Sequence, residues 1–321
     1  MPAITVPTFG DADVLTLADR PAREPGAGEV RIAVAAAAVN PTDLLTRSGA
    51  ASPDAAPASP LVPGMDAAGV VDAVGPDVTR LTVGDAVMAA VLPGRPEGGA
   101  YETALVVPAA SVVPIPDGAS PAQAATLPMN GLTAIEALDQ LALPDGGTLL
   151  ITGGAGWLAT LAIPLARERG LRVIADARPD EHDLVRAHGA DDVVDRGDGL
   201  ADRVRALVPD GVDGALDTAL IGPPLFPAIR DGGGWAVVRG QDDETERGIV
   251  RHQVFVRTRL EDTAALEHLR ALASAGTLPL TVAETFEPDR AADAHRRQDA
   301  GGVRGRLVIA FGAEADGPLG A

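Results

Sequence analysis

Short apolar runs separated by glycine and proline clusters fill the first third of the chain. Four of them have the length and composition of β-strands, with turn residues between them. They cover residues 29–39, 69–74, 85–92 and 104–107. This pattern predicts a mostly β region. The alanine- and proline-rich segment 50–60 has neither helical nor strand periodicity, so we expect a loop there.

From Ser120 onward, helical patterns alternate with continuous apolar strands. Ser120 and Gln123 form a capping box with Pro121 at the first helical position. We expect helices at 121–127, 131–143, 157–169, 182–188, 200–208, 262–275 and 290–298, and strands at 148–152, 172–175, 192–194, 214–217, 235–238, 280–286 and 306–311. Apolar strands that alternate with helices predict a parallel sheet with both faces covered. The fold class is therefore α/β.

Composition excludes several classes of function. The 321 residues are 46% hydrophobic and 22% charged, which is typical of a globular protein. The net charge of −19 argues against a nucleic-acid partner. All 26 basic residues are arginine and there is no cysteine, so lysine Schiff bases, disulfides and thiolate zinc sites are excluded. No leader pattern and no apolar run near 18 residues is present, so we expect a cytoplasmic protein without membrane contact.

A glycine-rich turn follows the apolar strand 148–152. Residues 154–159 fit the dinucleotide-binding pattern GxGxxA. Gly154 can take the tight turn, Gly156 lets the backbone approach a pyrophosphate, and Ala159 lets the next helix pack near the strand. The helix N-terminus supplies N–H groups for the anion. The expected cofactor contacts are Gly154, Ala155, Gly156, Trp157 and Leu158. The alternative is a turn that only packs a helix on a sheet.

Two residues after the second strand of this unit bear on the choice of dinucleotide. Asp176 stands 22 residues after Gly154, where an acid would accept hydrogen bonds from an adenosine ribose. Arg178 stands where a cation would meet a 2′-phosphate. Asp176 could instead be an exposed helix cap before Pro179. NADPH and NADH therefore both remain open at this point.

Seven further segments, collinear with the glycine turn, carry a family resemblance. They are residues 28–43, 61–78, 83–87, 98–106, 126–138, 188–195 and 303–309. In these segments the chain resembles the zinc-free, quinone oxidoreductase-like branch of the medium-chain dehydrogenase/reductase family. Zinc-dependent relatives place cysteine where Asp43 stands and a Gly-His-Glu run where this chain has Gly64, Met65 and Asp66. The resemblance therefore implies a site without zinc or another metal.

The resemblance also implies an architecture and an activity. A doubly wound, parallel-sheet Rossmann domain is expected at 121–257, and a mostly β GroES-like catalytic domain at 1–120 together with 258–321. The expected activity is metal-independent transfer of a hydride from NADPH or NADH to a small molecule, either a quinone or an α,β-unsaturated carbonyl. In such a reaction the protein contributes mainly by holding the cofactor and the substrate in the correct relative orientation. A homodimer is expected through edge-to-edge pairing of the nucleotide domains.

Four further site residues follow from the resemblance, each with an alternative. Asn40 would orient the nicotinamide or donate to the substrate oxygen, or else satisfy a turn before Pro41. Thr133 would contact the ribose beside the carboxamide, or bond within its own helix. Asp43 would be a buried polar partner in the catalytic site or a helix cap. Arg306 matches a basic residue in a closing motif of the family, or forms a surface ion pair.

Departures from the family pattern keep two other functions open. Leu45 stands where many relatives carry tyrosine, and Trp157 and Ala159 replace small residues of the glycine turn. The indole of Trp157 either points away from a bound pyrophosphate or crowds it. A cofactor-free family member that acts as a binding or assembly protein is therefore one alternative. A reductive cyclase of a natural product is another, compatible with the loop 50–60.

Overall fold

The structure is a computed structural model that describes residues 1–50, 60–240, 243–312 and 315–317. The chain divides into two compact units. The first comprises residues 1–129 and 257–321, and the second comprises residues 130–256. The division falls after Met129, inside helix α3 (Pro128–Leu141). The predicted loop 50–60 lies, except for its two end residues, outside the described residues.

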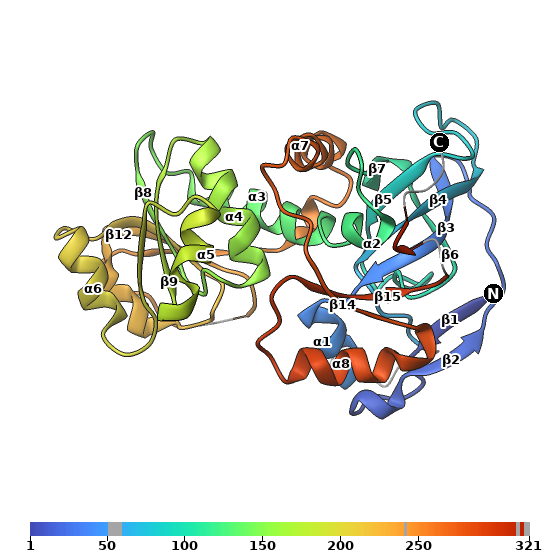
Figure 1. Cartoon of the computed structure of the whole chain (residues 1–321), viewed down its shortest axis with the longest axis horizontal. Coiled ribbons are helices and arrows are strands. Elements are labelled where there is room, and N and C mark those ends of the chain that lie inside the picture. The colour runs from blue at the N-terminus through green and yellow to red at the C-terminus, as the bar shows by residue number, and fades with distance from the viewer. Residues whose placement is uncertain (51–59, 241–242, 313–314, 318–321) are drawn as a thin grey trace. The chain divides into compact units, whose positions relative to one another are not determined.

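A mainly antiparallel sheet forms the first unit (Figure 1). Its strand order is β14-β15-β3-β4-β5-β7, and β6 pairs with β3. The strands are β3 (Glu29–Ala38), β4 (Asp66–Val74), β5 (Ala86–Ala90), β6 (Ala104–Pro108), β7 (Val112–Pro114), β14 (Val282–Phe286) and β15 (Arg306–Ala310). Only β14 and β15 run parallel to each other. A separate antiparallel pair is formed by β1 (Pro2–Thr5) and β2 (Thr16–Asp19).

Helices and short 3₁₀ turns complete the first unit. They are α1 (Pro41–Ser48), α2 (Pro121–Ala124), α7 (Thr263–Ser274), α8 (Ala291–Asp299), η1 (Ala12–Val14), η2 (Ala109–Ser111), η5 (Val256–Thr258, which begins at the last residue of the second unit) and η6 (Pro288–Arg290). Helix α8 packs against β14, β15 and α1 (Figure 1). The predicted capping box begins α2, because Gln123 N–H donates to Ser120 Oγ and Ser120 N–H donates to Gln123 Oε1. The core consists of apolar side chains, chiefly valine and alanine, most of them from the strands and some from loops and from α8.

Six parallel strands form the sheet of the second unit, in the order β10-β9-β8-β11-β12-β13. The elements are β8 (Thr148–Ile151), α4 (Trp157–Glu168), β9 (Arg172–Ala177), η3 (Pro179–Glu181), α5 (His182–Ala187), β10 (Asp192–Asp195), α6 (Leu200–Leu207), β11 (Val212–Asp217), η4 (Pro223–Ala228), β12 (Ile229–Val237) and β13 (Val250–Gln253). Numbered within the sheet, this order is 3-2-1-4-5-6, the doubly wound order of dinucleotide-binding domains. The chain reverses direction across the sheet between β8 and β11.

The predicted fold class is confirmed, and the differences in single elements have local causes. Helix α3 begins at Pro128 because proline is tolerated in a first helical turn, and it ends at Leu141 because Ala142 has a positive φ of 44°. Strand β12 begins six residues earlier than predicted, since its glycine-rich first half hides the apolar pattern. The edge strand β13 was not predicted, because its short sequence VRHQ lacks an apolar run.

Candidate functional site

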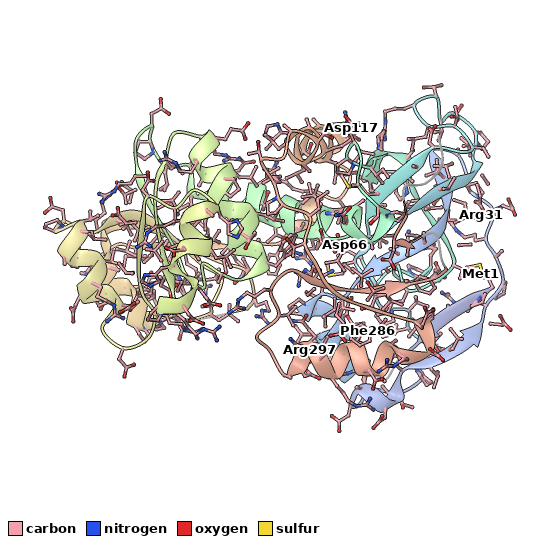
Figure 2. The ribbon with its side chains drawn as sticks, in the orientation of Figure 1. Met1, Arg31, Asp66, Asp117, Phe286 and Arg297 are labelled. Carbon is pink, nitrogen blue, oxygen red and sulfur yellow. The ribbon has the colours of Figure 1, made fainter. Side chains whose placement is uncertain are left out.

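A buried polar cluster of the first unit forms around Asn40, at the junction of β3 and α1. Asn40 is the N-cap of α1 and Asp43 lies in its first turn. Asp66 is the first residue of β4 and lies opposite Ala38 of β3, two residues before Asn40. Asp66 is labelled in Figure 2, and all three side chains are at most 2% exposed. Antiparallel pairing of β3 and β4 therefore brings together residues that are 26 positions apart in the sequence.

Hydrogen bonds fix the orientation of each member of this cluster. Asn40 Nδ2 donates to Asp66 Oδ2 at 2.6 Å, and Met129 N–H donates to Asp66 Oδ1 at 2.6 Å. Asp43 Oδ2 accepts from Asn40 N–H at 2.8 Å, and Asp43 Oδ1 accepts from Gly64 N–H at 2.9 Å. Asp43 is thus buried in this cluster and also caps the first turn of α1, so the predicted helix cap is present.

Tyr101 and His295 extend the cluster, and no local pattern around either residue predicts this role. Tyr101 Oη donates to Asp43 Oδ2 at 3.3 Å and lies 3.3 Å from His295 Nε2. The two rings meet edge to face, with centroids 5.8 Å apart. Burial, together with the charge of Arg47, lowers the pKa of His295 to about 3. His295 is therefore a neutral imidazole at physiological pH.

Arg306 is the basic residue of this cluster, at the start of β15. Its side chain is buried, with the residue 6% exposed, and its Nε has no hydrogen-bond partner among the described residues. The alternative of a surface ion pair is therefore wrong. Burial lowers the pKa of the guanidinium to about 10, while the charges of Asp66 and Asp43 favour its ionised form. A buried cation with an unused donor is suited to an anionic or carbonyl ligand.

The glycine turn of the second unit connects β8 to α4. Gly153 has a φ of +64°, and its N–H donates to Asp176 Oδ1 at 2.6 Å. Gly154 N–H donates to the carbonyl oxygen of Asp176 at 2.8 Å, and a Cβ on Gly154 would lie 2.9 Å from that oxygen. Gly156 is the N-cap of α4. The turn therefore lies against the end of β9, at a place where only glycine fits.

The remaining predicted residues of the second unit lie on neighbouring elements. Asp176 lies within β9 and is 4% exposed, so the alternative of an exposed helix cap is wrong. Arg178 is half-exposed and pairs with Glu181 at 3.0 Å and with Asp180 at 3.4 Å. At the start of α4, Trp157 is buried and Leu158 is half-buried; Ala155 is buried in the turn, and Thr133 is half-buried on α3. The glycine turn, Asp176 and Arg178 thus lie at the carboxyl ends of the neighbouring strands β8 and β9.

Asp217, at the carboxyl end of β11, is a buried carboxylate that sequence reasoning missed. It accepts hydrogen bonds from Thr152, Ile221 and Gly222 within 3.0 Å. The available signal was an acidic residue that ends the otherwise apolar strand segment GALD. Because β11 is the neighbour of β8, Asp217 lies beside the strand that leads into the glycine turn.

Two protein-family descriptions match the chain. Residues 26–117 match the alcohol dehydrogenase GroES-like domain, and residues 188–309 match the zinc-binding dehydrogenase family. The trans-enoyl reductase tazE of Aspergillus terreus is 34% identical over 232 residues, covering 64% of this chain and 76% of that protein. The chain belongs to the medium-chain dehydrogenase/reductase family. The resemblance stated from the sequence is thereby confirmed, and the family is one of oxidoreductases.

Other relatives of this medium-chain dehydrogenase/reductase include much longer proteins. The pikromycin polyketide synthase component PikAII of Streptomyces venezuelae is 39% identical over 186 residues. That match covers 58% of this chain and only 5% of the polyketide synthase component. The chain thus corresponds to a small part of that relative.

Solved structures of the family superpose on this protein over nearly the whole chain. A mycobacterial protein complexed with NADPH superposes with a TM-score of 0.84 at 27% identity, covering 97% of this chain and 100% of that one. The quinone oxidoreductase of Pseudomonas syringae pv. Tomato DC3000 superposes with a TM-score of 0.85 at 25% identity, covering 96% and 99%. Quinone oxidoreductases are therefore among the structural neighbours of this medium-chain dehydrogenase/reductase.

Two features are absent from the described part of this medium-chain dehydrogenase/reductase. Within the described ranges, no three or more histidine, aspartate or glutamate side chains gather in a way that could bind a metal ion. In the same ranges, no helix combines the length and the apolar character that crossing a membrane requires.

The two buried carboxyls predict a pH-dependent stability. Burial raises the pKa of Asp43 to about 6 and that of Asp66 to about 7. Unfolded carboxyls release their protons near a pH of about 4, so the stability contributed by this difference is complete below that pH. It is lost as the pH rises through about 6 and about 7. In urea unfolding, we expect the free energy of unfolding of the wild type, relative to that of Asp66→Asn, to fall as the pH rises from about 4 to about 7. A difference that stays constant over this pH range would contradict the raised pKa of Asp66.

Proposed function

We propose that this protein is an NADPH-dependent reductase that transfers a hydride to the β-carbon of an α,β-unsaturated carbonyl compound. The observation that carries this proposal is the glycine turn between the first strand and first helix of a doubly wound parallel sheet. In such sheets, ligands bind at the carboxyl ends of the strands, where the strand order reverses. The trans-enoyl reductases among the relatives support an enoyl substrate.

The second unit fits a dinucleotide in three respects. Gly154 lets the turn pack closely against the end of β9, where a Cβ would lie 2.9 Å from the carbonyl oxygen of Asp176. Gly156 is the N-cap of α4, and the N-terminus of this helix offers backbone N–H groups to a pyrophosphate. The buried carboxylate of Asp176 is already held toward the turn by Gly153, at the position expected for a ribose partner. Arg178 supplies a cation two residues later, which supports a 2′-phosphate and hence NADPH. Bound NADPH supplies the hydride.

The first unit supplies the polar contacts that the substrate needs. During reduction, negative charge develops on the substrate's carbonyl oxygen, and a fixed donor stabilises it. The acceptor Asp66 Oδ2 fixes the orientation of the Asn40 amide. Asp43 accepts from the backbone N–H of Asn40, and Tyr101 Oη in turn donates to Asp43. We assign Asn40 to the substrate oxygen or the nicotinamide carboxamide, and Arg306 to an anionic group of the cofactor. Both assignments rest on the family resemblance and on the burial of these side chains.

Deuterium transfer tests the proposed activity. The protein is first titrated with NADPH and NADH while tryptophan fluorescence is followed, and it is then given an enoyl thioester with NADPH that carries deuterium at the transferable position. We expect saturable binding, tighter for NADPH, and one deuterium at the β-carbon of the saturated product by mass spectrometry. No saturable binding of either cofactor would overturn the proposal and favour a cofactor-free binding protein.

A quinone is the second candidate substrate, favoured by the quinone oxidoreductases among the structural neighbours. Benzoquinone is therefore included in the same assay, with consumption of NADPH followed by absorbance. Turnover of benzoquinone, without formation of a deuterated saturated thioester from the enoyl substrate, would identify a quinone reductase. A deuterated product with a new ring would instead indicate reductive cyclisation.

A further inference from the structure

Two loops at the carboxyl edge of the second unit's sheet are tied together by side chains. One is the glycine turn after β8, and the other is the loop 217–222 after β11. Thr152 Oγ1 donates to Asp217 Oδ1 at 2.7 Å and accepts from Ala219 N–H at 3.0 Å. Thr218 Oγ1 donates to the carbonyl oxygen of Thr152 at 2.6 Å. Three hydrogen bonds therefore join the residue before the glycine turn to the neighbouring loop.

Asp217 also determines the shape of its own loop. Its Oδ1 accepts from Ile221 N–H at 3.0 Å, and its Oδ2 accepts from Gly222 N–H at 2.9 Å. Between these contacts Leu220 has a positive φ of 57°, which is a strained conformation for leucine. Such a conformation persists only where the surrounding contacts enforce it. The carboxylate of Asp217, fully buried and bonded to three donors, provides that enforcement.

The glycine turn packs directly on the loop that Asp217 shapes. A Cβ placed on Gly153 would lie 3.1 Å from Thr218 Oγ1 and 3.4 Å from the Cβ of Ala219. A shift of the loop 217–222 would therefore be transmitted to Gly153, and through it to the bond between Gly153 N–H and Asp176. Displacements of about 1 Å are enough to weaken a preorganised binding site substantially.

We propose that Asp217 is a positioning residue which, through Thr152, holds the glycine turn in the geometry that binds the dinucleotide. The proposal rests on the proposed function, because it takes the dinucleotide as the ligand. Electrostatics alone predicts the opposite effect for this residue. A buried negative charge near a pyrophosphate repels it, so removing the charge would strengthen binding if position did not matter.

Matched substitutions at two positions test the proposal. Asp217→Asn removes the charge and turns one acceptor into a donor facing Gly222 N–H. Thr152→Val keeps the side-chain shape and removes the hydroxyl, whereas Thr152→Ser keeps the hydroxyl. Three quantities are measured: the dissociation constant of NADPH by calorimetry, the KM values for both substrates, and hydrogen exchange of the Ala219, Ile221 and Gly222 amides in the free protein.

We expect the dissociation constant and the KM of NADPH to rise about tenfold in D217N and T152V, the scale of one lost hydrogen bond to a charged group. The KM of the enoyl substrate should change less than twofold, and T152S should retain wild-type values. The three loop amides should exchange faster in D217N and T152V. Unchanged or tighter binding of NADPH in both variants would overturn the proposal.

The amide exchange separates failure of this proposal from failure of the proposed function. Should the wild type bind no dinucleotide, the proposed function fails, and the role of Asp217 in cofactor binding fails with it. Faster hydrogen exchange of the three loop amides in the variants would then show only that Asp217 stabilises the loop. Should D217N fail to fold, T152V carries the test, because it removes a single hydroxyl and leaves the carboxylate bonded to Ile221 and Gly222.

Discussion

Replacing Gly156 with aspartate is expected to abolish dinucleotide binding while the protein stays folded. Gly156 has φ −78° and ψ 156°, a conformation that any residue can adopt, and an added Cβ would meet only the carbonyl oxygen of Gly153 at 3.0 Å. The new carboxylate would lie at the start of α4, where the proposed pyrophosphate binds. Repulsion between this carboxylate and the pyrophosphate predicts that the affinity for NADPH falls by at least about 100-fold. Tryptophan fluorescence titration with NADPH measures it.

Gly94→Asp provides the matched control for this substitution. Gly94 is exposed in the first unit, and an added Cβ would meet no atom within 4 Å. This variant carries the same change of charge and should bind NADPH as the wild type does. Thermal unfolding without cofactor should give both variants a midpoint close to that of the wild type. Wild-type affinity in G156D would contradict the assignment of the turn to the dinucleotide.

Asp43→Ala is expected to cost roughly 3 kcal/mol of unfolding free energy, because it leaves several buried donors without an acceptor. Asp43 accepts from Asn40 N–H, Gly64 N–H and Tyr101 Oη, and alanine replaces none of these bonds. Burial raises the pKa of this carboxyl, which offsets part of the loss. Urea unfolding at constant pH, with the midpoint and slope compared to the wild type, measures the change.

Asp72→Ala is the control for the loss of a carboxylate. Asp72 lies on β4 in the same sheet, and its partly exposed side chain pairs with Arg31 at 2.8 Å. Exposed ion pairs contribute less than about 1 kcal/mol, so this variant should remain close to the wild type in stability. The structural role assigned to Asp43 would be refuted if D43A and D72A unfolded at the same urea concentration.

Local patterns predicted most elements of the second unit, but not the edge strand β13 or the first half of β12. Helices packed on a parallel sheet require apolar strands alternating with helical periodicity, and the residues from 148 to 217 show that alternation directly. The glycine turn was also predictable, because its residues are contiguous and local sterics favour glycine at 153 and 154. Strand β13 was missed because an edge strand need not be apolar on both faces.

The polar cluster of the first unit was only partly predictable. Asn40, Asp43 and Arg306 were identified through a family resemblance, but the partners that hold them were not. Tyr101 reaches His295 across 194 positions of sequence, and Asn40 reaches Asp66 across 26. The burial of Arg306 follows from the place of β15 inside the sheet, between β14 and β3. Nothing in the residues next to Arg306 distinguishes this burial from an exposed ion pair.

By itself, the sequence determined the fold class, the position of the glycine turn and the absence of thiol and lysine chemistry. Each of these depends on residue types or on neighbours within one element. The tertiary structure decided which polar side chains meet, including Asp217 with Thr152 and Tyr101 with Asp43. Such contacts depend on the pairing and register of strands that are distant in sequence. A strand's own hydrophobic pattern determines which of its faces is buried, but it does not specify which distant strand will pair with it.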